Sequence, residues 1–500
     1  MSNAELHEEV KFLKTEVDRL NGMLLLLRQE KFGSKSERFV DPNQLVFNEI
    51  EVEASTLPDL SGESETETVT YKRAKPGRGK KKPFPENLPR EERFFDLDES
   101  EKTCPHDGTV LTPIGEERTE KLKVIPAQST VIIEIKKKYA CKTCDGHMAQ
   151  ASSNSILPGT IATPELLSFI VYSKFFQALP LYRLEEQFKL NGIGLTRGTM
   201  ARWLVGLTPK LMPLYNLLQD KVFSSGYMAI DATCVQVLKE KGRAAEKKSF
   251  MWARGSPELG IILFDYHPSG GGQIARKLME GYEGALQADA HRGYGALDHT
   301  KIDRLGCMMH ARRRFNEAFL IGTKAPGLAS EALTLFKWVY DKEDDYKKRG
   351  LSSNDRKLIR DKEIGPSLAA IKEWCEMKIV KVPKSSPLGN AMNYFITEYR
   401  ELTAFLADGR YEIDNGWVER TIRKFAIGRN NWMFCDTVEG AHASSMLYSL
   451  AITAKLNGKN PFTVLTEIFT RLPSAEAVED YAQLTELLLS PSSTQSCPKK

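Results

Sequence analysis

The stretch from residue 227 to residue 289 constrains the fold of this chain most, because its hydrophobic spacing becomes strand-like after a long helical region. The order of buried strands and helices restricts which sheets can form. Three apolar strands come first, then a helix, then a fourth strand ending in an aspartate: Tyr227–Leu238, Ser249–Arg254, Ile261–Tyr266, a helix beginning near Gln273, and Ala285–Asp289. Arg304–Met309 supplies a fifth strand that leads into a basic helix around residues 310–319.

This order is that of an RNase H-like sheet, in which the first and fourth strands are neighbours. Asp231 lies inside the first strand and Asp289 ends the fourth, so we expect the two carboxylates to face one another. A carboxylate within an apolar strand is costly unless it is paired or bound to a cation. A turn-capping role accounts for Asp289 alone, but it accounts less well for both aspartates together.

A third carboxylate is expected from a later helix. Residues 414–423 offer a capping Asp-Asn pair followed by a glutamate in the first turns of a helix. Glu412, Asp414 and Glu419 all compete for this position on the sequence alone. Three carboxylates around one site suit two Mg²⁺ (or Mn²⁺) ions that promote phosphoryl transfer.

Cationic side chains are expected near such a site to hold DNA phosphates, although some will be solvated helix faces. Between Pro164 and Leu218, two helices joined by a turn at Asn191–Gly194 resemble a helix-turn-helix, and Thr196 caps the second of them. An ordinary helical hairpin in a core has the same pattern. The DNA-binding candidates are Arg183, Arg197 and Arg202 here, and Arg312, Arg313, Arg420, Arg423 and Arg429 near the carboxylates.

The amino-terminal region is predicted to join two chains. From Leu6 to Leu27 the apolar residues recur at alternating spacings of four and three, which is a heptad seam. This favours a short coiled coil within residues 1–40, although an amphipathic helix that packs on its own chain has a similar pattern. Residues 41–95 are rich in charged residues, Ser, Thr and Pro, and they are predicted to be a disordered linker. Its basic run is by default a solvated charge run, although a flexible basic arm that follows a phosphate backbone has the same pattern.

Cysteines at two separate points predict a zinc-ribbon-like DNA-binding module in residues 96–150. The first comes before a strand-like stretch from Ser129 to Tyr139, and a close pair follows that stretch on a tight turn. An aspartate stands where a fourth cysteine is expected, so either another residue completes the Zn²⁺ site or the metal is absent. The expected ligands are Cys104, Cys141 and Cys144, with Asp107, His106 or His147 as the fourth.

Composition bounds the class of protein. A chain of 500 residues with 41% hydrophobic content is long for one compact domain, and its formal net charge of +4 says little about partners. We find no run of about 18 apolar residues, and the charged start is unlike a signal peptide. We therefore expect a soluble cytoplasmic protein without a membrane partner. The 8 cysteines suit reduced thiols and a metal site rather than a disulfide framework.

The motifs together resemble those of transposases of the insertion sequence 66 family, over almost the whole chain. The resemblance is most specific in the carboxy-terminal blocks Ala426–Trp432 and Ala454–Gly458. It is also carried by the heptad start, Phe32–Glu37, the cysteine-bearing ribbon, Leu179–Arg183, Leu286–Asp289, Cys307–Arg313, and Asp414–Asn415 through Glu419–Arg420.

The resemblance implies the DDE mechanism, with Asp231, Asp289 and Glu419 as the catalytic, metal-binding residues. It favours Glu419 as the third carboxylate, and it marks Cys307 and His310 as an accessory pair. A buried cysteine and a core histidine are the ordinary alternative for that pair. The implied partners are DNA, as terminal inverted repeats and target, further copies of the chain in a homodimer or higher oligomer, and accessory proteins of the same element.

The sequence therefore predicts a multidomain α+β protein. The RNase H-like α/β catalytic core spans residues 222–470 and carries a helical insertion at about 322–405, since about 130 residues separate the second and third carboxylates. A helical module at 155–220 precedes it, and a helix and tail at 471–500 follow. The predicted function is DNA cleavage and strand transfer. A non-catalytic DNA-binding regulator and a nuclease without strand transfer are the rival interpretations.

Overall fold

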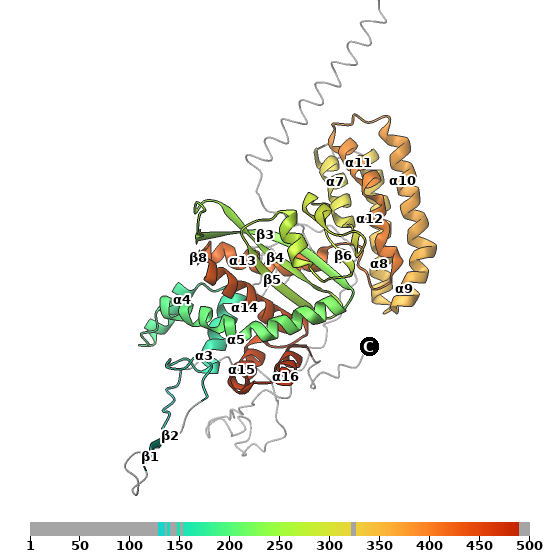
Figure 1. Cartoon of the computed structure of the whole chain (residues 1–500). Helices are drawn as coiled ribbons and strands as arrows, with labels where there is room; N and C mark the ends of the chain where they lie inside the picture. The colour runs from blue at the N-terminus through green and yellow to red at the C-terminus, as the bar shows by residue number, and fades with distance from the viewer. Residues whose placement is uncertain (1–128, 136–137, 141–147, 151–153, 322–326, 490–500) are drawn as a thin grey trace, which may run out of the picture. The chain divides into compact units, whose positions relative to one another are not determined.

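The computed structural model describes residues 129–135, 138–140, 148–150, 154–321 and 327–489 (Figure 1). Residues 129–135 belong to one compact unit and the remaining described residues to another. The predicted coiled coil, the linker and the ribbon cysteines lie outside the described residues. Among the described residues, no helix is long and apolar enough to cross a membrane.

The strand expected over Ser129–Tyr139 is mostly wrong. Residues 129–135 carry no strand, and their apolar side chains are exposed, so the β-branched pattern here finds no sheet surface to pack against in the described structure. Only β1 (Lys138–Ala140) lies in the expected range, and it pairs antiparallel with β2 (Met148–Gln150).

A mixed sheet forms the centre of the larger unit. Its strand order is β5-β4-β3-β6-β7, and β8 pairs with the far end of β3. The first three strands are antiparallel neighbours, whereas β6 and β7 run parallel to β3. The expectation that the first and fourth strands are neighbours is confirmed. The strands are β3 (Tyr227–Lys239), β4 (Lys248–Ser256), β5 (Ile261–His267), β6 (Gly284–Gln287), β7 (Ile302–Leu305) and β8 (Cys435–Thr437).

Two strand ends differ from the sequence prediction. β6 ends at Gln287, so Asp289 lies two residues beyond the strand and not in it. β7 ends at Leu305, and the chain turns at once into helix α7, which begins at Met308. Gly306 donates its backbone N–H to the carbonyl oxygen of Glu401 at 2.7 Å, so the backbone after β7 is held by the helical insertion instead of continuing the sheet.

Helices cover both faces of the sheet. Phe264 of β5 packs against Phe425 of α13 and Tyr448 of α14 on one face, while Arg254 of β4 reaches Gln219 of α5 on the other. The helices around the sheet are α3 (Pro164–Val171), η1 (Tyr172–Phe176), α4 (Leu181–Leu190), α5 (Arg197–Ser224), α6 (Gly272–Leu278), η2 (Arg292–Ala296), α13 (Gly416–Trp432), α14 (Val438–Leu456), α15 (Pro461–Arg471), η5 (Leu472–Ser474) and α16 (Val478–Leu489).

The helices before the sheet belong to the same hydrophobic core as the sheet. Thr196 caps α5 through a bond from the N–H of Thr199, as expected, but α5 continues to Ser224 and buries one side along its length. Its apolar residues join one core cluster with the strands and with α14 to α16. The boundary that we placed near residue 221 therefore does not separate two hydrophobic cores.

The insertion has a hydrophobic core of its own. Residues of α7 and of the helices that follow it pack around Phe336 and Phe395, and the helical character predicted for this region is confirmed (Figure 1). The elements are α7 (Met308–Ile321), α8 (Leu328–Lys348), α9 (Ser353–Ile359), η3 (Arg360–Ile364), α10 (Gly365–Ile379), α11 (Pro387–Thr397), α12 (Tyr399–Thr403) and η4 (Ala404–Ala407).

Helix α14 satisfies the backbone of the outer strand β5. Ser449 accepts from the N–H of Phe264 at 2.8 Å. Thr453 accepts from the N–H of Ile262 at 3.1 Å and donates to the carbonyl of the same residue at 3.2 Å. Both hydroxyl-bearing residues are buried. A buried backbone amide without a partner is costly, so these two polar side chains of α14 stabilise the sheet.

We predict that Ser449→Ala combined with Thr453→Val destabilises the unit, because two buried backbone amides lose their acceptors. Each should cost about 1–3 kcal/mol of unfolding free energy, measured by urea denaturation. Thr466→Val is the matched control, since its hydroxyl bonds only to Phe462 of its own helix α15. Equal stability of the double variant and this control would contradict the assignment.

Candidate active site

The two predicted aspartates belong to neighbouring parts of the sheet, with Asp231 inside β3 and Asp289 two residues beyond the end of β6. β3 and β6 are parallel, and their register pairs Ala229 with Gln287. Asp231 and Asp289 each follow that pair by two residues, so the strand pairing brings them to the same level. Both are partly buried. The expectation that the two carboxylates come from adjacent strands therefore agrees with the register.

The side chain of Asp231 points to the face of the sheet that α13 covers. In the antiparallel ladders Asp231 is paired with Ala253, and Ala253 is paired with Phe264. Paired residues share a face. Because Phe264 contacts Phe425 of α13, Asp231 lies on the α13 side of the sheet. Its own Oδ1 accepts from the N–H of Ala232 at 2.7 Å.

Tyr294 of η2 lies near both aspartates. Burial raises the pKa of its hydroxyl well above the usual value, and the negative charges of Asp231 and Asp289 raise it further. The Asp289 carboxylate also accepts from the backbone N–H of His291 at 3.0 Å, which fixes the turn after β6. The residue types after Asp289, with two glycines near Tyr294, are those of a turn. Apart from its short distance in sequence from Asp289, nothing in the sequence marks Tyr294 as a site residue.

Glu419 lies one turn into α13, and the start of that helix is bonded directly to β3. The side-chain amide of Asn415 donates to the carbonyl oxygen of Ile230, the residue before Asp231, at 2.9 Å. Asn415 is buried and does not cap the helix with its side chain. Asp414 does so instead, accepting from the N–H of Gly416 at 2.9 Å. The predicted Asp-Asn cap is thus divided between two roles.

Cys307, His310 and Glu419 bring their ligand atoms together. These atoms all lie within 4.8 Å of one another, and they form the one such metal-capable group among the described residues. Nδ1 of His310 lies 3.8 Å from Oε1 of Glu419, and the thiol of Cys307 donates to the same oxygen at 4.0 Å. Burial raises the pKa of the Cys307 thiol well above its usual value, with Asp414 and Glu419 adding to the shift. The Cys307 thiol therefore keeps its proton and can donate a hydrogen bond to the Glu419 carboxylate.

The donor types bear on which ion this region fits. Asp231, Asp289 and Glu419 would offer carboxylate oxygens only, which suits Mg²⁺ or Mn²⁺. The tighter group of sulfur, nitrogen and oxygen suits a softer ion such as Zn²⁺. Three observations fit the carboxylate set: the strand register of the two aspartates, the shared face with α13, and the bond from Asn415 to Ile230.

The two other carboxylates that competed for the third position are engaged elsewhere. Glu412 forms ion pairs with Lys347 and with Arg356, both on helices of the insertion. Asp414 accepts from the hydroxyl of Tyr340 at 3.0 Å as well as capping α13. Glu419 is the competitor that lies beside Cys307 and His310.

The eight predicted DNA-binding arginines differ in their surroundings. Arg183, Arg197 and Arg202 are exposed on α4 and α5. Arg313 lies 4.0 Å from Glu419, and Arg312 stacks over the ring of Tyr340. Arg429 is turned inward, where it donates to Oγ1 of Thr233 at 3.0 Å and so ties α13 to β3. Of the remaining two, Arg420 is exposed and Arg423 is partly buried on α13.

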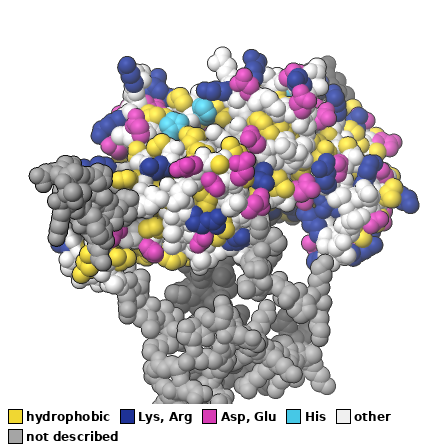
Figure 2. All heavy atoms as spheres, turned by 60° about the horizontal axis from the view of Figure 1, so that its bottom comes forward, with side chains coloured by type: hydrophobic (Ala, Val, Ile, Leu, Met, Phe, Trp, Pro, Cys, Tyr) yellow, Lys and Arg dark blue, Asp and Glu magenta, His cyan; other side chains and the backbone are white. Residues whose placement is uncertain are grey.

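The surface in Figure 2 carries basic and acidic side chains side by side. Where grey atoms leave it visible, this face shows no broad surface of one sign.

Comparison with known families agrees with this geometry. The profile of the family described as "Transposase IS66 family" matches residues 159–443, which include the whole sheet, the insertion and α13. The chain belongs to the IS66 family of transposases. Two further IS66-type profiles match the region before it: "Transposase C of IS166 homeodomain" at residues 19–93, and "zinc-finger binding domain of transposase IS66" at residues 101–145. The second of these spans the ligand candidates Cys104, His106, Asp107, Cys141 and Cys144 but not His147.

Relatives of this IS66-family chain come from Sinorhizobium fredii. "Uncharacterized protein y4qI" is 27% identical over 487 residues, covering 94% of this chain and 88% of the relative. "Uncharacterized protein y4jD" is 28% identical over 494 residues, covering 94% of each. No solved structure matches the chain significantly.

Proposed function

We propose that this IS66-family chain is a DDE transposase, which cleaves DNA at the ends of its element and joins those ends to target DNA. The observation that carries the proposal is the register of β3 and β6, which sets Asp231 level with Asp289, together with the bond that holds the start of α13 at Ile230. The strand order and mixed directions support an RNase H-like core.

Asp231, Asp289 and Glu419 would hold two Mg²⁺ or Mn²⁺ ions. Bound there, these ions supply Lewis-acid stabilisation of the attacking and leaving oxygens of a phosphodiester. The protein contributes the positions of the carboxylates. Asn415 fixes the entry of α13 against β3, and the Cys307 thiol orients the Glu419 carboxylate. Arg313 lies beside Glu419. When DNA binds, we expect a phosphate to take the place of Glu419 as the partner of Arg313.

The proposed reaction has two phosphoryl-transfer steps, a hydrolysis followed by a transesterification. Water attacks the phosphodiester at an element end, and the 3′ oxygen leaves as a free hydroxyl. That hydroxyl then attacks a phosphodiester of the target, whose own 3′ oxygen leaves, so one phosphodiester bond forms as another breaks. The carboxylates serve both steps without changing their own bonding.

The partners of this reaction are DNA ends, target DNA and further copies of the chain. We propose that the transposase works as a homodimer or higher oligomer, joined through the heptad region, since two ends must be held together for coordinated transfer. We also propose that accessory proteins encoded by the same element take part in the reaction. The protein would act in the bacterial cytoplasm, at the nucleoid.

The decisive experiment incubates the full-length protein with DNA that carries the terminal inverted repeats and with a target plasmid. Mg²⁺-dependent nicks at the repeat ends and joined products are expected. Binding without cleavage would make the chain a regulator, and cleavage without joined products would make it a nuclease.

The zinc-finger match leads to a separate prediction. Elemental analysis of the purified protein should find about one zinc ion per chain, because thiolates at Cys104, Cys141 and Cys144 are preferred zinc ligands. Cys141→Ser should lower the zinc content and destabilise that module while sparing the catalytic fold. Wild-type protein without zinc would end this idea.

A further inference from the structure

The chain between η4 and α13, residues 408–415, is here called the linker segment. One side of it contacts the catalytic sheet. Its backbone N–H at Glu412 donates to the hydroxyl of Tyr227 at 2.9 Å, and Asn415 donates to the carbonyl of Ile230 at 2.9 Å. The carbonyl of Ile413 accepts from the N–H of Met308 at 3.2 Å. The linker segment is thus fastened to the elements that carry Asp231 and Cys307.

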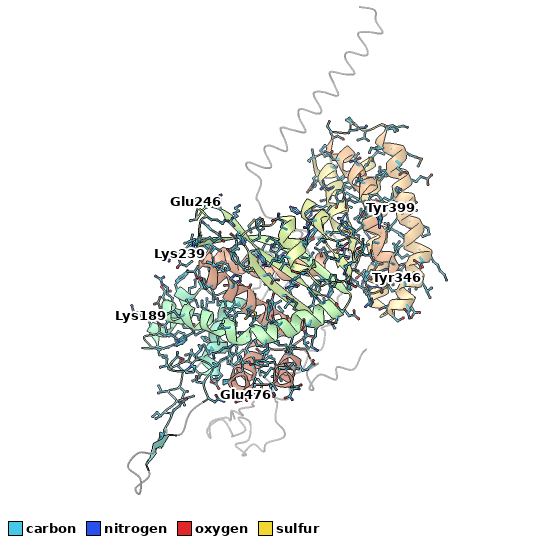
Figure 3. The ribbon with its side chains drawn as sticks, viewed as in Figure 1. Lys189, Lys239, Glu246, Tyr346, Tyr399 and Glu476 are labelled. Atoms are coloured by element: carbon cyan, nitrogen blue, oxygen red, sulfur yellow. The ribbon has the colours of Figure 1, made fainter. Side chains whose placement is uncertain are left out.

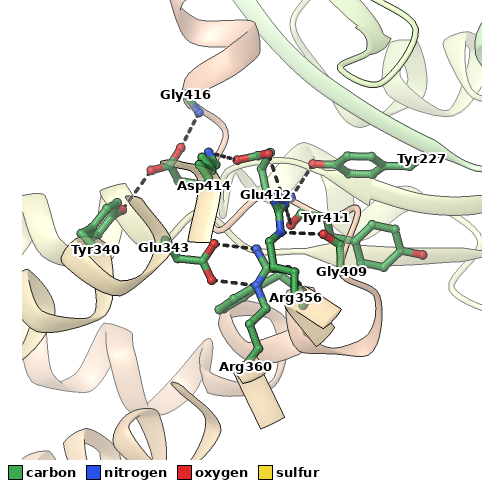
Figure 4. Close-up of polar contacts among 12 residues, drawn as sticks. Tyr227, Tyr340, Glu343, Arg356, Arg360, Gly409, Tyr411, Glu412, Asp414 and Gly416 are labelled. Carbon is green, nitrogen blue, oxygen red and sulfur yellow. Dashed lines mark hydrogen bonds and ion pairs between the residues drawn. The ribbon is translucent and has the colours of Figure 1, made fainter. Parts of the chain in front are cut away.

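The other side of the linker segment contacts the helical insertion (Figure 4). Tyr340 of α8 donates its hydroxyl to Oδ2 of Asp414 at 3.0 Å, while Oδ1 of the same carboxylate caps α13 at the N–H of Gly416. Burial raises the pKa of Tyr340 well above the usual value, and the charge of Asp414 adds to this, so the hydroxyl keeps its proton for this bond.

Arg356 of α9 makes a second attachment. Its Nε donates to the carbonyl of Gly409 at 2.7 Å, and one terminal nitrogen donates to the carbonyl of Tyr411 at 3.3 Å and to Glu412 at 3.4 Å. The backbones approach closely here, because a Cβ on Gly409 would lie 1.8 Å from the carbonyl oxygen of Ser353. The Arg356 side chain is 13% exposed, so its bonds are shielded from water.

The linker segment leads directly into the turn of α13 that bears Glu419, whose backbone N–H bonds to the carbonyl of Asn415 at 3.1 Å. A shift of the segment would therefore move Glu419 relative to Asp231. We propose that Tyr340 and Arg356 of the insertion are positioning residues, which hold the linker segment so that Glu419 completes the metal-binding carboxylates. This inference rests on the proposed function, because it assigns Glu419 that role.

The test measures cleavage by the full-length protein across a range of Mg²⁺ concentrations. Tyr340→Phe removes the hydroxyl that bonds to Asp414. The half-saturating Mg²⁺ concentration should rise about tenfold, because that factor corresponds to the loss of one hydrogen bond to a charged group. The rate should recover at saturating Mg²⁺. Thermal unfolding and binding of end DNA should stay as in the wild type, since a misplaced carboxylate affects metal binding first.

Tyr346→Phe is the matched control, because Tyr346 lies on the same helix (Figure 3) and its hydroxyl donates to Glu363, a residue outside the linker segment, at 3.1 Å. It should leave the Mg²⁺ dependence unchanged. Arg356→Lys keeps the charge but loses the forked geometry, so it should shift the Mg²⁺ dependence in the same direction. If Tyr340→Phe fails to fold, Arg356→Lys tests the same proposal in its place.

Binding of Mn²⁺ to the protein, followed by electron paramagnetic resonance, separates the two proposals. If Glu419→Gln leaves Mn²⁺ binding and cleavage unchanged, the proposed active site is wrong. If Glu419→Gln weakens both while Tyr340→Phe and Arg356→Lys behave like Tyr346→Phe, the positioning role alone is overturned. Weakened Mn²⁺ binding in Tyr340→Phe but not in Tyr346→Phe supports it.

Discussion

Asp231→Asn, Asp289→Asn and Glu419→Gln should each abolish DNA cleavage and joining, with rates falling at least about a hundredfold. Each change keeps the shape of the side chain but removes a charge that would bind metal. Folding and binding of element ends should change little, because the three residues are only partly buried and lie outside the hydrophobic core. Gel assays of nicked and joined products, with circular dichroism for folding, measure both.

The matched control is Asp436→Asn. Asp436 is an exposed carboxylate on β8, the strand beside the far end of β3, and it pairs with Lys239. Its loss should leave cleavage within about twofold of the wild type, because exposed ion pairs contribute little. Full activity of any one of the three active-site variants would remove that residue from the site.

Glu343→Gln should cost the insertion about 3–5 kcal/mol of stability, since it leaves the Arg360 guanidinium buried without its countercharge. The pair is bidentate, with contacts of 2.7 and 2.8 Å, and the side chains are 4% and 0% exposed. Arg360 also donates to the carbonyls of Phe405 and Asp408, at the start of the linker segment. Urea unfolding followed by circular dichroism measures the loss.

Two comparisons test this assignment. Asp361→Asn breaks an exposed pair with Lys357 on the neighbouring turn and should cost less than about 1 kcal/mol. Replacing both buried partners, Glu343→Leu with Arg360→Met, should recover much of the stability, because no unpaired charge remains. Stability of Glu343→Gln within about 1 kcal/mol of the wild type would show that the charge is solvated and the pair unimportant.

The sheet was predictable because its strands carry their own signal. β3, β4 and β5 contain longer apolar runs than a surface strand would have. These runs predicted the ends of the three strands to within two residues. Residues 129–135 have the same β-branched character, yet they form no strand in the described structure. A strand needs a neighbour, and local composition does not report whether one is present.

The third carboxylate was not predictable from residues alone. Glu412, Asp414 and Glu419 lie within one short stretch, and what distinguishes them is contact with distant positions. Asp414 bonds to Tyr340 and Glu412 pairs with Lys347, both in the insertion. Such long-range polar contacts leave no periodic trace in the sequence. Family resemblance favoured Glu419, which is also the member of the three beside Cys307 and His310.

The bonds from α14 to β5 have a consequence for crowded assemblies of this transposase. An outermost strand with free amides invites strand addition by a second chain, which is a common route to aggregation. Ser449 and Thr453 occupy those amides within the same chain, so this border of the sheet is closed to β-augmentation. If copies of the chain gather on one DNA molecule, as proposed above, they would recognise each other through surfaces other than β5, and their sheets would not merge along that strand.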